Sequence, residues 1–180
     1  MDDLSLVELF FERDECALAI LEEKYGKACR TIADNVLSDT RDAEECVNDT
    51  LLAVWNSIPP TRPRSLHGFV LRIARAKAID KLRYNTREKR DCSQLILLEE
   101  IDECAAPTEV GDNECEELIN GLLSSLGVRS RVIFVSRYFR LESVSSIAKR
   151  LGLSENVVSV DLFRTRKKLK KILIQKGIKR

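Results

Sequence analysis

The sequence predicts an all-α fold with two small helical domains joined by an acidic linker. Apolar residues recur at intervals of three and four along most of the chain, which is the period of amphipathic helices. Only seven Gly and four Pro interrupt the 180 residues. The segment 91–113 contains Pro107 and Gly111 but no basic residue, and it divides the helical pattern into two parts.

The first predicted domain spans residues 14–90. Three helices are predicted in it, at residues 14–36, 42–56 and 66–89. Ser38-Asp39-Thr40 supplies a turn and a cap between the first two helices. Pro59-Pro60-Thr61-Arg62-Pro63 excludes a helix, because proline lacks a backbone donor and restricts the residue before it. The third helix is therefore expected to start after this loop.

The second predicted domain spans residues 114–175 and follows the linker at 91–113. Four helices are predicted in it, at residues 114–126, 129–140, 143–151 and 155–175. Gly152 suits the left-handed position that ends a helix, and Ser154 suits the N-cap of the next helix. The last two helices therefore form a predicted helix-turn-helix.

Charge is divided into four blocks along the chain, although the net charge is only +1. Residues 1–61 hold 5 basic and 14 acidic side chains (−9), and residues 62–90 hold 10 and 2 (+8). Residues 91–128 hold none and 10 (−10), and residues 129–180 hold 15 and 3 (+12). Two basic blocks separated by an acidic one predict two nucleic-acid contact surfaces on one chain.

Composition argues against several classes of protein. No stretch approaches the roughly 18 apolar residues of a membrane span. Met1-Asp2-Asp3 lacks the basic start of a signal peptide, so a cytoplasmic protein is expected. The six cysteines include no C-x-x-C pair and His67 is the only histidine, so we expect reduced thiols and no metal site. No catalytic constellation stands out, and we expect neither an enzyme activity nor a cofactor.

The helix predicted at 155–175 has a buried side and an outward side. The outward side presents Asn156, Val160, Arg164, Lys167 and Lys171, with Phe163 at its edge. Its first half is nearly neutral and its second half is strongly basic. This gradient is typical of a recognition helix, whose early residues meet base edges and whose later cations meet phosphates. An ordinary helical hairpin with a basic surface is the alternative.

Two helices of the first domain have contrasting surfaces. In the helix at 66–89, cations emerge between apolar residues that wrap nearly all round it, so we expect it to lie between neighbouring helices and against a polyanion. A solvated charged end is the alternative.

In the helix at 42–56, Leu52 lies among Glu45, Asn48 and Asp49 on the side opposite the core. Acids repel phosphate, whereas an apolar centre with a polar rim is typical of a protein contact.

Three parts of the chain resemble the sigma-70 family. Residues 42–55, DAEECVNDTLLAVW, resemble its region 2.2, and residues 72–83, RIARAKAIDKLR, resemble its regions 2.3 and 2.4. The residues that resemble region 4 are Leu126, Arg129, Arg131, Arg137-Tyr138, Ser143, Ile147-Ala148, residues 151–154 and residues 164–169. The resemblance covers about 14–90 and 114–175. Regions 2 and 4 alone are typical of the small extracytoplasmic-function group.

The resemblance implies a sigma factor that binds core RNA polymerase and directs promoter-specific initiation. The residues implied to bind the clamp helices of the largest polymerase subunit are Asp42, Glu45, Asn48, Asp49, Leu52 and, more structurally, Trp55. Those implied to engage the −10 element are Arg72, Arg75, Ala76, Lys77, Lys81 and Arg83, with a flipped base held against the loop at 56–65. Those implied to read the −35 element are Asn156, Ser159, Val160, Phe163, Arg164 and Lys167. An anti-sigma factor is a further implied partner.

Four positions depart from the pattern of the family. Ala76 replaces a common Asn, Phe69 a common Trp, Ser159 a common Lys or Arg, and Asp161 a common Arg. Asp161 lies about 100–110° from the centre of the outward face, so it need not meet phosphate. The resemblance therefore indicates the function of the chain more clearly than the promoter sequence that it recognises. Two other functions stay open: a stand-alone helix-turn-helix regulator, and a helical adaptor whose basic ends bind acidic partners.

Overall fold

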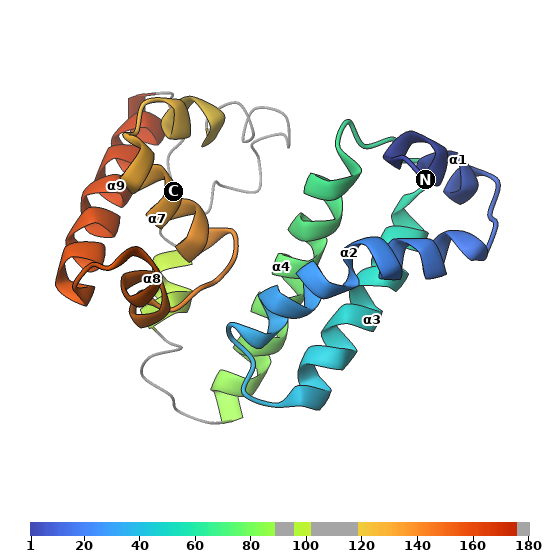
Figure 1. Cartoon of the computed structure of the whole chain (residues 1–180), viewed down its shortest axis with the longest axis horizontal. Coiled ribbons are helices and arrows are strands. Elements are labelled where there is room, and N and C mark those ends of the chain that lie inside the picture. Colours follow the sequence, from blue (N-terminus) through green and yellow to red (C-terminus); the bar gives the residue numbers. More distant parts are fainter. Residues whose placement is uncertain (89–95, 102–118, 176–180) are drawn as a thin grey trace. The chain divides into compact units, whose positions relative to one another are not determined.

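The computed structural model describes residues 1–88, 96–101 and 119–175, and all regular secondary structure in these ranges is helical (Figure 1). The predicted all-α class is confirmed. The chain divides into two compact units, Met1–Arg90 and Asp91–Arg180. None of the helices in the described ranges is long and apolar enough to cross a membrane.

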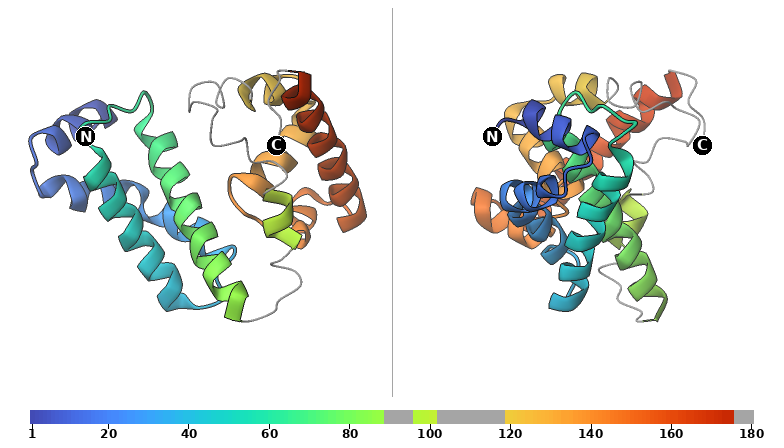
Figure 2. Two further views of the ribbon diagram at one scale, coloured as in Figure 1. Left: turned by 180° about the vertical axis from the view of Figure 1, so that it is seen from behind. Right: turned by 90° about the vertical axis from the view of Figure 1, so that its right-hand side faces the viewer.

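The first unit contains α1 (Asp3–Phe11), α2 (Cys16–Asp34), α3 (Thr40–Ser57) and α4 (Leu66–Glu88). Helices α3 and α4 lie side by side, and α2 packs across both of them (Figures 1 and 2). Helix α1 contacts α2 and α4. The core of this unit consists of fully buried side chains from all four helices, among them Leu6, Phe10, Leu21, Val54, Val70 and Ala74.

Helix α1, of nine residues, was not predicted from the sequence. Asp2 caps it, since its Oδ1 accepts from the Ser5 amide at 2.8 Å. Leu6, Val7 and Phe10 are buried, so the helix is part of the core of the first unit. The first unit therefore includes residues that precede the predicted start of the first domain at residue 14.

The other three helices of this unit lie within two residues of their predicted bounds. Asp39 caps α3 as expected, because its carboxylate accepts from the Arg41 amide at 2.7 Å. Helix α4 lies between neighbouring helices as expected, since α1, α2 and α3 all contact it, but not all of its apolar residues are buried. Its buried stripe follows every fourth residue, whereas Phe69 and Ile73 are half-buried. The reason is that α1, α2 and α3 pack on a limited part of its circumference.

The second unit contains α7 (Val128–Tyr138), α8 (Val144–Leu151) and α9 (Glu155–Gln175), with shorter helical segments at 96–101 and 119–124. Helices α7 and α8 both pack on α9 (Figure 1). Fully buried side chains from α7, α8, α9, the segment 119–124 and the turn after α7 contribute to its core, including Leu122, Ile133, Leu141, Ile147 and Leu162. The predicted helix at 114–126 is described only from residue 119 onward, where it is helical to residue 124.

The helical segment 96–101 lies within the predicted linker but belongs to the second unit. Leu97, Leu98 and Ile101 are buried. The carboxylate of Glu100 pairs with arginines of α7 and α9. A short apolar run carries no local signal of the surface against which it packs, so the linker prediction did not anticipate this docking. The remaining residues of the predicted linker lie outside the described ranges.

Candidate nucleic-acid interface

The outer face of α3 combines carboxylates with an exposed leucine. Four side chains of this face are exposed: Glu45, Asn48, Asp49 and Leu52. Their spacing of three and four residues places them on one side of the helix. The exposed fraction of Leu52 is 57%, which is large for an apolar residue on an otherwise polar face. An apolar centre with a polar rim is the composition of a protein–protein contact.

Lys81 of α4 binds two carboxylates of α3. Its Nζ lies 2.7 Å from Glu45 Oε2 and 3.2 Å from Asp42 Oδ1. Asn85 Nδ2 donates to the other oxygen of Asp42 at 2.8 Å. The hydrogen bond to Glu45, with a smaller effect of Asp42, raises the pKa of Lys81. Three residues that the sequence assigned to two different partners are thus engaged with one another across the α3–α4 contact.

Trp55 is half-buried at the end of α3, in surroundings that support a structural role. The Phe10 ring meets it edge-on, with the ring centroids 5.9 Å apart. The Arg13 guanidinium lies 5.1 Å from the centroid of the indole ring and donates to the Trp55 carbonyl at 2.8 Å. Arg13 has a φ of 58°, an uncommon value for a side chain of its size. These contacts tie the turn between α1 and α2 to the end of α3.

The residues predicted to contact the −10 element, apart from Lys81, divide by exposure. Arg72, Ala76 and Arg83 are exposed, and Arg75 and Lys77 are half-buried. Guanidinium groups bind phosphate with a planar pair of donors, and they need only partial exposure to do so. Ala76 is small and exposed, and it lies between Arg75 and Lys77 in the sequence. The surface of α4 is thus suited to a nucleic-acid backbone.

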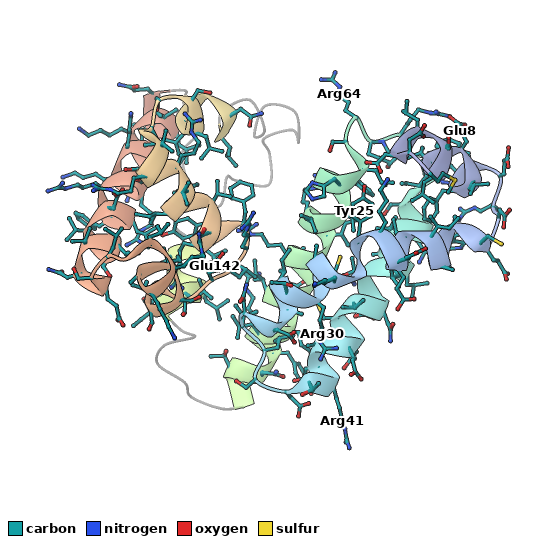
Figure 3. All side chains as sticks on the ribbon, in the orientation of Figure 1. Glu8, Tyr25, Arg30, Arg41, Arg64 and Glu142 are labelled. Carbon is teal, nitrogen blue, oxygen red and sulfur yellow. The ribbon has the colours of Figure 1, made fainter. Side chains whose placement is uncertain are left out.

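The loop at 58–65, between α3 and α4, is fixed by contacts that the sequence did not reveal. Arg62 donates to both carboxylate oxygens of Glu8 on α1, with Nη2 3.1 Å from Oε2. Its guanidinium also lies 4.4 Å from the centroid of the Phe11 ring. The hydrogen bonds from Arg62 lower the pKa of Glu8. Arg64, by contrast, points away from the loop (Figure 3).

Helices α8 and α9 form the predicted helix-turn-helix. Ser143 caps α8, since its Oγ accepts from the Ser146 amide at 3.1 Å. Gly152 ends α8 in the left-handed conformation, with a φ of 64°, as its sequence position predicts. Ser154 Oγ accepts from the Val157 amide at 3.4 Å in the first turn of α9. Local chemistry along the sequence thus accounts for the turn.

The two sides of α9 separate as the helical period predicts. Its buried residues are Val158, Leu162, Thr165 and Leu169. All six residues predicted to read the −35 element are exposed: Asn156, Ser159, Val160, Phe163, Arg164 and Lys167. The structure therefore brings the predicted set together on the outer surface of one helix.

A groove of about 400 Å³ lies between the start of α7 and the N-terminal half of α9. Arg129, Arg164 and Lys168 supply its positive charge. Asp161 Oδ2 accepts from Ser130 Oγ at 3.1 Å and lies 3.6 Å from Arg129 Nε. Asp161 therefore faces α7, and the groove keeps an excess of cations. Arg129 and Lys168 were not among the predicted site residues, although both lie in the basic block at 129–180.

An ionic network connects the recognition helix to the rest of the second unit. Glu100 Oε2 accepts from Arg137 Nε at 2.9 Å, and Glu100 Oε1 lies 2.9 Å from Arg166 Nη1. Arg166 Nη1 also donates to Tyr138 Oη at 2.7 Å. Glu142, between α7 and α8 (Figure 3), pairs with Arg150 of α8 at 2.9 Å. Arg166 thus points inward and is not one of the exposed cations of α9.

Together these surfaces are suited to binding. The exposed face of α9 and the cations of α4 match a polyanion. The exposed face of α3, with an apolar centre and a polar rim, is suited to contact with a protein. Within the described part of the chain, no group of three or more His, Cys, Asp or Glu could hold a metal ion.

Comparisons with known proteins give a family model for each unit. The chain matches Sigma-70 region 2 over residues 21–88 and Sigma-70, region 4 over residues 116–169. The search of curated proteins found no significant match. Among solved structures, the chain is similar to CnrH, as seen in a structure of CnrH in complex with the cytosolic domain of CnrY. That match has 23% identity and a TM-score of 0.46, and it covers 96% of this chain and 97% of that chain.

Proposed function

We infer the roles of the two units from the fact that this chain belongs to the sigma-70 family, whose members direct promoter-specific initiation by RNA polymerase. The chain is a sigma factor that binds core RNA polymerase and promoter DNA. We place it in the small extracytoplasmic-function group because regions 2 and 4 are present. In this proposal the polymerase carries out the chemistry of RNA synthesis, and the chain acts in the cytoplasm without a cofactor or metal.

The observation that best supports this proposal is the contrast between the exposed faces of α3 and α9. One is acidic around an exposed leucine, and the other is cationic. A chain that bound only DNA would gain nothing from an acidic and apolar face, since carboxylates repel phosphate. A chain that bound only protein would not need the cationic face. A factor that holds polymerase with one surface and DNA with another uses both.

We propose that the clamp helices of the largest polymerase subunit dock on α3. Asn48, Asp49 and Leu52 are the central contacts. Asp42 and Glu45 contribute at the edge of this surface, where they also neutralise Lys81. Trp55 supports the end of the helix through Phe10 and Arg13 rather than by touching the partner.

We propose that α4 engages the −10 element. Arg72, Arg75, Lys77 and Arg83 contact the phosphates, and Ala76 leaves room for a flipped base beside the loop at 58–65. Lys81 differs from these residues because Asp42 and Glu45 hold it, so its contribution is to orient α4 against α3.

We propose that α9 reads the −35 element in the major groove. Asn156, Val160, Phe163 and Arg164 face the bases, with Ser159 beside them and Lys167 directed at a phosphate. Asp161 bonds to Ser130 at 3.1 Å and is 11% exposed, which supports its exclusion from this set.

The α3 assignment is tested by reconstituting the full chain with core polymerase. Leu52→Asp places a charge where an interface centre is expected, so it should weaken core binding at least tenfold. Leu4→Asp is the matched control, because Leu4 is also an exposed leucine of the first unit, at 74%. Binding is measured by anisotropy of the labelled chain. Equal affinities of the two variants would contradict the proposed face.

The α9 assignment is tested by run-off transcription from a template library with random upstream sequence. Arg164→Ala should keep core binding but lose most dependence on the −35 sequence, because one bidentate contact is worth about 1–3 kcal/mol. Lys27→Ala removes an exposed cation from the other unit and is the control. Normal promoter selection by Arg164→Ala would show that the face is wrongly assigned. Tight binding to a palindromic duplex without polymerase would favour the stand-alone regulator.

We further propose an anti-sigma factor as a third partner. The support is the family resemblance of the sequence together with the exposed Leu52, which a regulator could cover in place of polymerase. Leu52→Asp would then also weaken capture of such a regulator. A regulator bound equally well by wild type and by Leu52→Asp would have to dock on another surface.

A further inference from the structure

Helix α9 exposes three large apolar side chains within seven residues. Val157 and Val160 are each 40% exposed, and Phe163 is 59% exposed. The buried residues of α9 lie on another side of the helix, so these three lie outside the buried core of the unit. Water contact makes their exposure unfavourable. A partner that buries them is therefore expected.

The surroundings of these side chains indicate a polyanionic partner. Arg164 and Lys167 flank them along α9, and Arg129 and Lys168 extend the positive charge across the adjoining groove. Asp161 lies in the same stretch of α9, but its carboxylate is turned toward Ser130 and Arg129. An apolar centre ringed by cations does not match an acidic peptide alone, which would leave the apolar centre uncovered. It matches the major groove of DNA, where phosphates border a floor that carries the thymine methyl groups.

We propose that Val160 and Phe163 recognise the C5-methyl groups of thymines in the −35 element, with Val157 covering the edge of the contact. The inference rests on the proposed role of α9 and specifies the bases that it reads. Val160 and Phe163 are separated by three residues, which is about 4.5 Å along the helix and about 60° around it. This offset is comparable to the rise of about 3.4 Å between base pairs, so the two side chains reach neighbouring pairs.

The hydrogen-bonding groups beside these residues define the rest of the site. Between Glu155 and Phe163 the sequence contains no Lys or Arg. Asn156 is suited to adenine, because an amide matches its N6 and N7 groups. Arg164 is suited to guanine O6 and N7. The expected −35 element therefore contains A·T pairs, with thymines distinguished from cytosines by their methyl groups and a G·C pair opposite Arg164.

Replacing thymine by uracil tests this proposal, because it deletes the methyl group and keeps every hydrogen-bonding edge of the base pair. Holoenzyme made from core polymerase and the full chain first selects −35 sequences from a random duplex library. The enriched duplex is then resynthesised with one uracil at each thymine position in turn. We expect about fourfold weaker holoenzyme binding per contacted methyl, at one or two positions. Val160→Ala and Phe163→Ala should each bring the penalty at one of these positions below about 1.5-fold.

Ile174→Ala is the matched control. Ile174 is an exposed aliphatic residue, at 56%, on the same side of α9 but about 21 Å further along the helix than Val160. It should leave every uracil penalty unchanged. All three substitutions are at exposed helix positions where alanine is favourable, so folding is preserved.

The outcomes separate the inference from the function on which it rests. An enriched −35 sequence that tolerates uracil at every thymine would overturn the methyl contact but leave −35 reading by α9 intact. Uracil penalties that persist in both Val160→Ala and Phe163→Ala would also overturn the assignment to these side chains. A library from which no −35 sequence is enriched would overturn both proposals.

Discussion

Replacing Glu100 by alanine should destabilise the second unit by about 3 kcal/mol and leave the first unit unchanged. Glu100 is 15% exposed and accepts from the Nε of Arg137, which is 7% exposed. It also pairs with Arg166, which is 17% exposed. The alanine variant would leave two largely buried guanidinium groups without their carboxylate.

The size of the effect follows from what each arginine retains. Breaking a buried ion pair costs about 3–5 kcal/mol, because one charge stays buried without compensation. Two partners soften the loss here: Arg137 still donates to the Glu142 carbonyl at 3.1 Å, and Arg166 still donates to Tyr138 Oη at 2.7 Å. The lower end of that range therefore applies to the loss in the free energy of unfolding of the second unit.

Urea unfolding with two probes measures this effect unit by unit. Trp55 is the only tryptophan and lies in the first unit, so its fluorescence reports that unit alone, whereas far-UV circular dichroism reports both. With an m-value near 1.5 kcal/mol/M, the circular dichroism transition of the second unit should move down by about 2 M. Glu99→Ala, an exposed neighbour, is the control. Identical transitions for the two variants, or an equal shift of Trp55 fluorescence, would refute the reasoning.

Three further predictions concern single side chains. Burial raises the pKa of the Cys29 and Cys46 thiols to about 11, so alkylation mapped by mass spectrometry at pH 8 should be at least about tenfold slower than in urea. Hydrogen bonds from Lys24 and, to a smaller extent, from Tyr25 lower the pKa of Asp3 below its usual 3.8. Asp3→Asn should therefore lower the free energy of unfolding by about 1 kcal/mol at pH 7. In acid titrations of stability, this difference between the variant and the wild type should disappear as pH falls below about 3.8. Gly152→Ala should cost about 1 kcal/mol in urea unfolding, because the φ of 64° is strained although nothing lies within 4 Å of the added carbon. Equal alkylation rates, a pH-independent Asp3→Asn difference, or an unchanged Gly152→Ala midpoint would contradict these three in turn.

Features governed by local chemistry could be predicted from the sequence. The caps at Asp39 and Ser154 and the left-handed Gly152 depend on residues within a few positions of each other. The exposed faces of α3 and α9 follow from the helical period, which fixes the side on which each residue lies. The charge blocks added the chemical character of those faces.

Features governed by distant partners could not be predicted. Glu100 meets Arg137 across 37 positions, and Lys81 meets Glu45 across 36. Nothing local in the sequence distinguishes a cation that meets phosphate from one that neutralises a neighbouring helix, so Lys81 was assigned to DNA. Helix α1 was missed for a related reason. Its buried residues are informative only once the helices against which they pack are known.

The docking of residues 96–101 onto the second unit has a mechanical consequence for the whole chain. From residue 88, where α4 ends, to residue 96, the backbone can extend at most about 28 Å, the length of about eight base pairs of B-DNA. The buried Leu97, Leu98 and Ile101, together with the ion pairs of Glu100, thus set this limit by the eight residues from 89 to 96 rather than by the thirty that separate α4 from residue 119.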